Sequence, residues 1–116
     1  MAKRTSRQRK KFREMLLKRD GRCMVCGKYL EDRTINPHHI TTKGAGGDDQ
    51  PENGISLCQA CHVAVHNGQH SPASLRWILK FVYGYTYPSW QLGGPDDCEA
   101  ARDHYYSRHL RTYEYF

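Results

Sequence analysis

The chain has 116 residues, enough for one domain but few for two, and only 38% of them are apolar. A core this small usually needs a metal ion or disulfides to stabilise it. The sequence contains no apolar run of about 18 residues, which excludes a membrane-spanning helix, and it lacks the apolar stretch of a signal peptide. We therefore expect a cytoplasmic protein that has no membrane partner.

The predicted elements begin with a helix over residues 6–19, after five residues that are expected to be disordered. Phe12, Met15 and Leu16 repeat at helical spacing, and Asp20-Gly21 supplies a stop. The other faces are basic: half of the 18 Lys and Arg residues fall in the first 19 positions of a chain whose net charge is +6. Such a segment is typical of proteins that bind nucleic acid, the alternative being a tail that only aids solubility. The candidate DNA-binding residues are Arg4, Arg7, Arg9, Lys10, Lys11 and Arg13.

The middle of the chain is predicted to be short extended segments and loops. Residues 28–42 are compatible with β-structure, with a break at Asn36-Pro37. The glycine-rich stretch 43–51, acidic near its end, is predicted to be a loop, and residues 59–65 a short helix.

The last part of the chain is predicted to be helical and rich in aromatic residues. Ser71 and Pro72 suit the N-cap and first position of a helix. Another helix is predicted from residue 95 or 96 to about residue 112. The aromatic residues in this region are expected to complete a small core or a dimer contact rather than stack on bases: Trp77, Tyr83, Tyr85, Tyr87 and Trp90.

Four of the five cysteines form two Cys-x-x-Cys units, Cys23/Cys26 and Cys58/Cys61. A two-residue spacer lets one tight turn direct two thiolates at one ion, so two such turns predict a closed tetrahedral zinc site. In a reducing compartment this pattern favours metal over disulfides. Cys98 has no such partner, and a catalytic role for it is not expected.

Four histidines lie at informative positions. If residues 59–66 are helical, His62 and His66 share one face and suit one metal ion, while Cys58 and Cys61 point roughly 90° away from them. His38 and His39 are adjacent in an extended segment, so their side chains point to opposite faces. One of them can then bind metal while the other, as a neutral imidazole, acts as a base. His70, His104 and His109 are expected to be surface or packing residues.

Together these residues resemble the HNH endonucleases, and most closely the branch with four zinc-binding cysteines found in bacteria and their phages. The resemblance covers about residues 10–67. It rests on both Cys-x-x-Cys units and on His38-His39-Ile40, Gly46-Gly47-Asp48, Glu52-Asn53, His62 and His66. It implies an α+β fold with a small ββα-metal, treble-clef-like core, stabilised by the four-cysteine zinc site, with a basic N-terminal helix and C-terminal helices.

The resemblance also implies a role for each site residue. His38, His62 and His66 would bind the catalytic ion, His39 would be the general base, and Asn53 would brace the loop and orient that base. The ion would be Mg²⁺, Mn²⁺, Ni²⁺ or Zn²⁺, in addition to the structural Zn²⁺. The implied reaction is hydrolysis of DNA, with the double-stranded form as the expected substrate and with 5′-phosphate and 3′-hydroxyl ends on the products.

We expect the chain to be divided into a basic, partly disordered arm (1–11), a nuclease core (12–70) and a C-terminal extension (71–116) packed on the same domain.

A phage-encoded or restriction-related role, in a bacterium or a phage-infected cell, fits the resemblance. The oligomeric state, monomer or homodimer, is left open by the sequence. The main alternative is a non-catalytic zinc-containing DNA-binding module, and a third interpretation is a protein-interaction zinc module.

Overall fold

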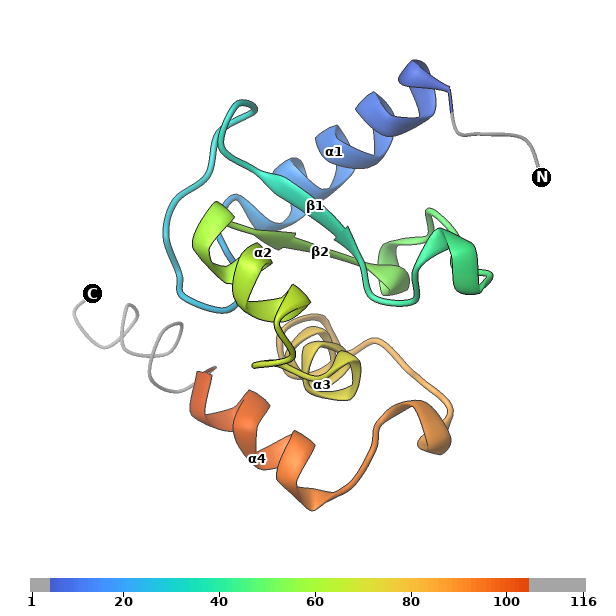
Figure 1. Ribbon diagram of the computed structural model, residues 1–116, viewed down its shortest axis with the longest axis vertical. Helices are drawn as coiled ribbons and strands as arrows, with labels where there is room; N and C mark the ends of the chain where they lie inside the picture. The colour runs from blue at the N-terminus through green and yellow to red at the C-terminus, as the bar shows by residue number, and fades with distance from the viewer. Residues whose placement is uncertain (1–4, 105–116) are drawn as a thin grey trace.

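The computed structural model describes residues 5–104 and, within them, an α+β fold with a two-stranded antiparallel sheet (Figure 1). The strands are β1 (Asn36–His39) and β2 (Gly54–Leu57). The α-helices are α1 (Ser6–Asp20), α2 (Gln59–His66), α3 (Pro72–Tyr83) and α4 (Pro95–His104). Short 3-10 helices lie at Lys43–Ala45, Pro51–Asn53 and Ser89–Gln91. The predicted continuation of the last helix beyond residue 104 lies outside the described residues, as do residues 1–4. No helix among the described residues combines the length and the apolar character needed to span a membrane.

Local signals account for the limits of α1. Thr5 caps the helix through a reciprocal pair of hydrogen bonds with Gln8. At the other end Gly21 adopts the left-handed conformation (φ 66°), which glycine tolerates without a steric penalty. Phe12 and Leu16 are buried, so the predicted helix and its apolar face are both confirmed.

The expected break at Asn36-Pro37 is wrong, because Pro37 lies inside β1 and faces Ser56 of β2. Proline has no N–H to donate to a neighbouring strand, so it is tolerated only where none is needed. The backbone of Ser56 is directed elsewhere: its N–H donates to Asp20 Oδ2, and its carbonyl accepts from the N–H of Met24. Placing Pro37 opposite Ser56 therefore removes no hydrogen bond from the sheet.

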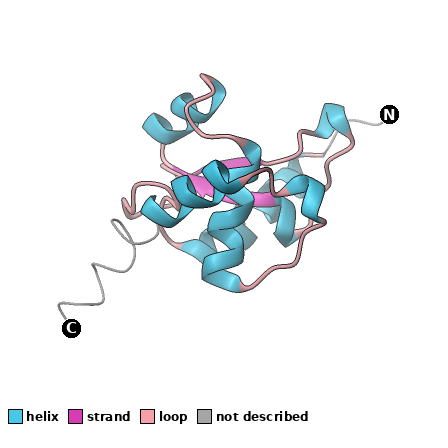
Figure 2. Ribbon diagram, turned by 90° about the horizontal axis from the view of Figure 1, so that it is seen from below, coloured by secondary structure: helices cyan, strands magenta, loops and turns pink. Residues whose placement is uncertain are grey.

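The register of the sheet places α1 and α2 on opposite faces. Gly54 and Ser56 face α1: a Cβ at Gly54 would lie 2.7 Å from Cζ of Phe12, and the Ser56 hydroxyl donates to the carbonyl of Leu16. Ile55 and Leu57 face the other way and are fully buried. Figure 2 shows the strands in the middle of the molecule, between helices. Each face of the sheet can therefore present one side chain of the His38-His39 pair to a different helix.

The segment after residue 70 completes the same hydrophobic core. Leu75, Ile78 and Leu79 of α3 are buried in one cluster with Leu16 and Ile55. Three of the predicted aromatic residues also pack against this cluster, whereas a fourth, Trp90, is 79% exposed; the three are Trp77, Tyr83 and Tyr85.

Candidate functional site

The four cysteines of the two Cys-x-x-Cys units come together between the turn before residue 28 and the start of α2. Their Sγ atoms all lie within 4.8 Å of one another. In each unit the backbone N–H of the second cysteine donates to the Sγ of the first, at 3.5 Å. Cys58 is also the N-cap of α2. The two turns thus converge on one small volume.

The geometry of this cluster fits a tetrahedral zinc ion. Zn–S bonds of about 2.3 Å imply Sγ–Sγ separations of about 3.8 Å, and the Sγ atoms of Cys26 and Cys58 are 3.7 Å apart. Burial favours the neutral thiol, but hydrogen bonds from the Cys61 backbone and neighbouring thiols lower the pKa of Cys58 to about 7. Burial and the negative charge of Cys23 instead raise the pKa of Cys61. A bound cation would relieve this crowding of thiols.

A second cluster consists of three histidines, His38 from β1 and His62 and His66 from α2. One ring nitrogen of each lies within 4.8 Å of the others. The Nε2 atoms of His62 and His66 are 3.0 Å apart, and the two ring centroids are 4.5 Å apart. His38 presents its ring edge-on to both, at centroid distances of 5.7 and 5.6 Å.

The three imidazoles also fit a divalent ion. Metal–nitrogen bonds of about 2.1 Å place neighbouring nitrogens about 3.0–3.4 Å apart, and the His62–His66 distance lies in this range. Burial, with the charges of His62 and His66, lowers the pKa of His38 to about 4, and burial lowers the pKa of His62. Both are therefore neutral at pH 7, the form that binds metal. The cysteine and histidine clusters are separate, although α2 contributes to each.

His39 points away from both clusters, toward α1. Its ring stacks on Phe12 with centroids 4.2 Å apart and an interplanar angle of 3°. Its Nε2 lies 2.8 Å from Oδ1 of Asp49, and only 13% of the side chain is exposed. An ionised Asp49 accepts from Nε2–H, which leaves the lone pair on Nδ1. The ring is thus fixed in position and in tautomer by two neighbours.

Asn53 joins the two ends of the loop between β1 and β2. Its Oδ1 accepts from the N–H of Thr41 at 2.7 Å. Its Nδ2 donates to the carbonyls of Thr41 and Asp48, at 3.0 and 2.9 Å. The side-chain amide of Asn53 therefore links Thr41, which is two residues after His39, to Asp48, which is the residue before Asp49.

The candidate DNA-binding residues differ in their surroundings. Arg7, Arg9, Lys10 and Lys11 are exposed on α1, whereas Arg13 is half-buried, with its Nε 3.0 Å from Oδ1 of Asp32. Arg4 lies outside the described residues. These exposed residues are spread around the first turns of α1, so this end of the helix is basic on several sides and can contact a polyanion.

Sequence reasoning missed Asp49 and the part that Phe12 plays beside His39. Phe12 belongs to the predicted apolar face of the first helix, but a helical pattern does not reveal which ring it meets. The acidic end of the glycine-rich loop was the available signal for Asp49.

A cavity of about 300 Å³ also lies between this loop and residues 76–91. Its lining includes Asp48, Asn53, Arg76 and Tyr87.

Comparisons with known proteins match the part of the chain that holds both clusters. Residues 23–68 match the model of the HNH endonuclease family. The chain is 33% identical over 57 residues to the type IV methyl-directed restriction enzyme EcoKMcrA of Escherichia coli (strain K12), a match that covers 44% of this chain and 21% of that protein. It is 34% identical over 47 residues to Anaredoxin of Nostoc sp. (strain PCC 7120 / SAG 25.82 / UTEX 2576), a match that covers 40% of this chain and 59% of that protein.

The matched region spans only part of each relative, a fifth of one and less than two thirds of the other. No solved structure gives a significant match. The family match and the restriction enzyme support a nuclease or DNA-binding role, and the cysteine cluster supports metal binding.

Proposed function

We propose, for a chain whose residues 23–68 match the HNH endonuclease family, that it hydrolyses phosphodiester bonds in double-stranded DNA. The products would carry 5′-phosphate and 3′-hydroxyl ends. One observation carries the proposal: adjacent histidines serve different neighbours. His38 faces the imidazoles of α2, whereas His39 is held apart from them by Phe12 and Asp49. Nuclease chemistry needs both a metal ligand and a separate base.

His39 would be the general base. Its Nδ1 would take a proton from the attacking water, while Asp49 holds the ring through Nε2 and stabilises the imidazolium that forms. Phe12 keeps the ring plane fixed. Asn53 would brace the loop from Thr41 to Asp48 and so keep Asp49 in reach of His39.

His38, His62 and His66 would hold the catalytic ion, with three imidazoles favouring Zn²⁺, Ni²⁺ or Mn²⁺ somewhat over Mg²⁺. Such an ion supplies Lewis-acid stabilisation of the charge on the scissile phosphate and the leaving oxygen. The four cysteines would hold a structural zinc ion, which leaves no open coordination position for substrate.

We also propose that residues 12–70 form the nuclease core and that residues 71–116 are an extension, whose described part, residues 71–104, packs on that core. The hydrophobic cluster shared by α1, β2 and α3 supports the packing of this extension on the core. Residues 1–11 would act as a basic arm, whose described part is the first turns of α1.

The direct test is to incubate the protein with plasmid and defined duplexes, with Mg²⁺, Mn²⁺, Ni²⁺ or Zn²⁺ added one at a time, and to sequence the ends. Cleavage that leaves 5′-phosphates supports the proposal. Tight DNA binding without cleavage under any of these ions would overturn it in favour of a non-catalytic DNA-binding module. The match to a restriction enzyme supports including methylated duplexes among the substrates.

Neutralising exposed basic residues in the first turns of α1 is expected to lower the affinity for DNA and to make that affinity less dependent on salt. Each phosphate that the protein no longer neutralises should make the slope of log K against log[salt] shallower by about 0.9. The triple variant Arg7→Gln, Arg9→Gln, Lys11→Gln should therefore have a slope that is shallower by up to about 2.7, measured by fluorescence anisotropy between low and moderate salt. These three residues are exposed.

The matched control removes the same charge from other elements. Lys28→Gln, Arg33→Gln, Arg102→Gln changes three exposed residues outside α1. Equal slopes for the two triple variants would show that net charge alone, rather than a surface on α1, governs binding.

A further inference from the structure

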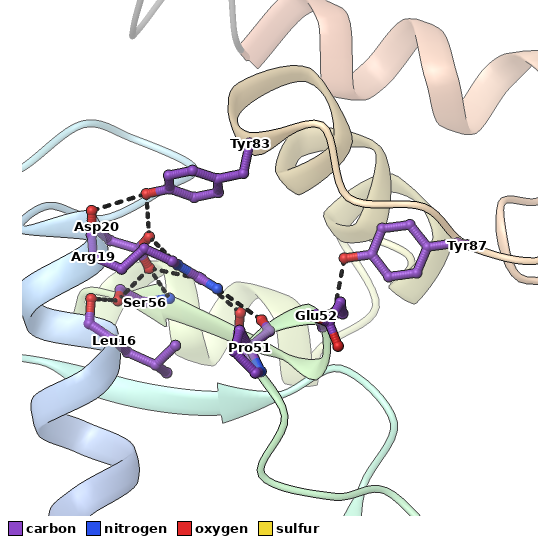
Figure 3. Close-up of polar contacts among 9 residues, drawn as sticks. Leu16, Arg19, Asp20, Pro51, Glu52, Ser56, Tyr83 and Tyr87 are labelled. Carbon is purple, nitrogen blue, oxygen red and sulfur yellow. Dashed lines mark hydrogen bonds and ion pairs between the residues drawn. The ribbon is translucent and has the colours of Figure 1, made fainter.

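The backbone that carries Asn53 is held by side chains from outside the region that matches the HNH family. Arg19, in α1, donates from Nη1 to the carbonyl of Pro51 at 2.7 Å and from Nη2 to the carbonyl of Gly54 at 2.8 Å. Tyr87, beyond α3, donates from its hydroxyl to the carbonyl of Glu52 at 2.8 Å. Figure 3 shows the two side chains reaching this segment from different elements.

These bonds and two backbone bonds satisfy the four successive carbonyls of residues 51–54. The carbonyl of Pro51 also accepts from the N–H of Gly54. The carbonyl of Asn53 accepts from the N–H of Ile40 at 2.8 Å, which is an ordinary hydrogen bond between the two strand ends. The carbonyls on either side of it, at residues 51, 52 and 54, all accept from Arg19 or Tyr87. A guanidinium suits this task because its fixed fork can reach two acceptors at once.

Neighbours outside the loop also hold the side chain of Arg19 in place. Its guanidinium forms two hydrogen bonds with the fully buried carboxylate of Asp20, at 2.7 and 3.1 Å, and only 12% of its side chain is exposed. It lies 4.8 Å from the ring centroid of Tyr83 and 5.7 Å from that of Tyr85. The Tyr83 hydroxyl donates to the carbonyl of Arg19 and contacts Asp20 (Figure 3). Burial would lower the pKa of Arg19, but the bond and the charge of Asp20 raise it, so the side chain stays charged.

We infer that Arg19 and Tyr87 are positioning residues for Asn53, so that α1 and the segment after α3 are part of the nuclease machinery. This inference rests on the proposed function of the loop. The bonds to the carbonyls fix residues 51–54, Asn53 then fixes Thr41 and Asp48, and these flank the positions of His39 and Asp49. The route from Tyr87 to the candidate base thus consists of hydrogen bonds joined by one or two residues of backbone.

The test compares two conservative variants with a matched control. Tyr87→Phe removes one hydroxyl but keeps the ring, and Arg19→Lys keeps the charge beside Asp20 but cannot reach both carbonyls. Tyr29→Phe removes a hydroxyl from a residue that is 72% exposed and lies on the turn of the first Cys-x-x-Cys unit. All three are examined by amide hydrogen exchange and by cleavage kinetics.

In the exchange experiment, which needs neither catalytic metal nor DNA, the Thr41 N–H reports on Asn53 because its acceptor is the Asn53 side chain. We expect exchange at Thr41 to accelerate about tenfold or more in Tyr87→Phe and Arg19→Lys, with amides of α3 unchanged. In cleavage assays kcat should fall about tenfold while KM stays within about twofold. Tyr29→Phe should match the wild type in both measurements.

Uniform acceleration of exchange throughout the chain would overturn the inference, because it would assign Tyr87 a purely global role in stability. Unchanged exchange at Thr41 would overturn it as well. If the wild-type protein cuts no DNA, the proposed function fails, but the exchange result still decides whether Arg19 and Tyr87 position Asn53. The two failures are therefore distinguishable.

Discussion

Replacing His39 with alanine is expected to lower the rate of DNA cleavage by a factor of about 10²–10⁴, the usual contribution of a general base. The ring is stacked on Phe12 and bonded to Asp49, outside the three-histidine cluster. Its removal should therefore leave metal binding and DNA affinity close to those of the wild type. Single-turnover cleavage, metal content and DNA binding, measured on the same preparation, check all three expectations.

The matched control is His70→Ala, which removes a half-buried imidazole outside both metal clusters. It should cut at nearly the wild-type rate. Undiminished cleavage by His39→Ala would remove His39 from the mechanism. A parallel loss of metal from His39→Ala would instead make His39 a ligand rather than a base.

Replacing Cys58 with serine is expected to have the largest effect on folding. Cys58 is buried, and its Sγ lies 3.7 Å from that of Cys26, so the substitution removes one of the four thiolate ligands. Serine can still cap α2 in place of Cys58, so the loss of the ligand is the change that matters. Structural zinc binds to small domains with about 10–16 kcal/mol, whereas whole domains are stable by only about 5–15 kcal/mol. The variant should therefore lack a cooperative thermal transition by circular dichroism and should contain less than one zinc ion per chain.

Cys98→Ser provides the control, since Cys98 is half-buried in α4 and lies outside the four-cysteine cluster. It should unfold within a few degrees of the wild type and retain zinc. Removing zinc from the wild-type protein with a strong chelator should reproduce the behaviour of Cys58→Ser. A Cys58→Ser protein that melts cooperatively at the wild-type temperature would exclude a structural zinc site that depends on this residue.

Local sequence signals predicted the elements that depend on them. Gly21 ended α1, Ser71 and Pro72 began α3, and the spacing of His62 and His66 placed both imidazoles on one side of α2. The resemblance gave the order of the ββα core correctly, because its residues follow one another at fixed spacings along residues 23–68. These features need no knowledge of distant contacts.

Features that depend on distant contacts were not predicted. Pro37 looks like a break because proline usually interrupts strands. Its place in the register, opposite a Ser56 whose backbone groups bond to Asp20 and Met24, requires no N–H from it. Arg19 looks like one more basic residue of the N-terminal segment. Its place beneath Tyr83 depends on a contact between residues 64 positions apart, which no local pattern encodes.

The shortness of α2 limits which insertions and deletions the sequence can accept during evolution. This eight-residue helix starts from a cysteine of one cluster and ends on a histidine of the other. A single residue inserted or deleted between Cys61 and His62 would turn the histidines by about 100° about the helix axis relative to the cysteines. Insertions and deletions should therefore be rare within α2 in related sequences. They should be more common in the exposed loop at residues 42–46.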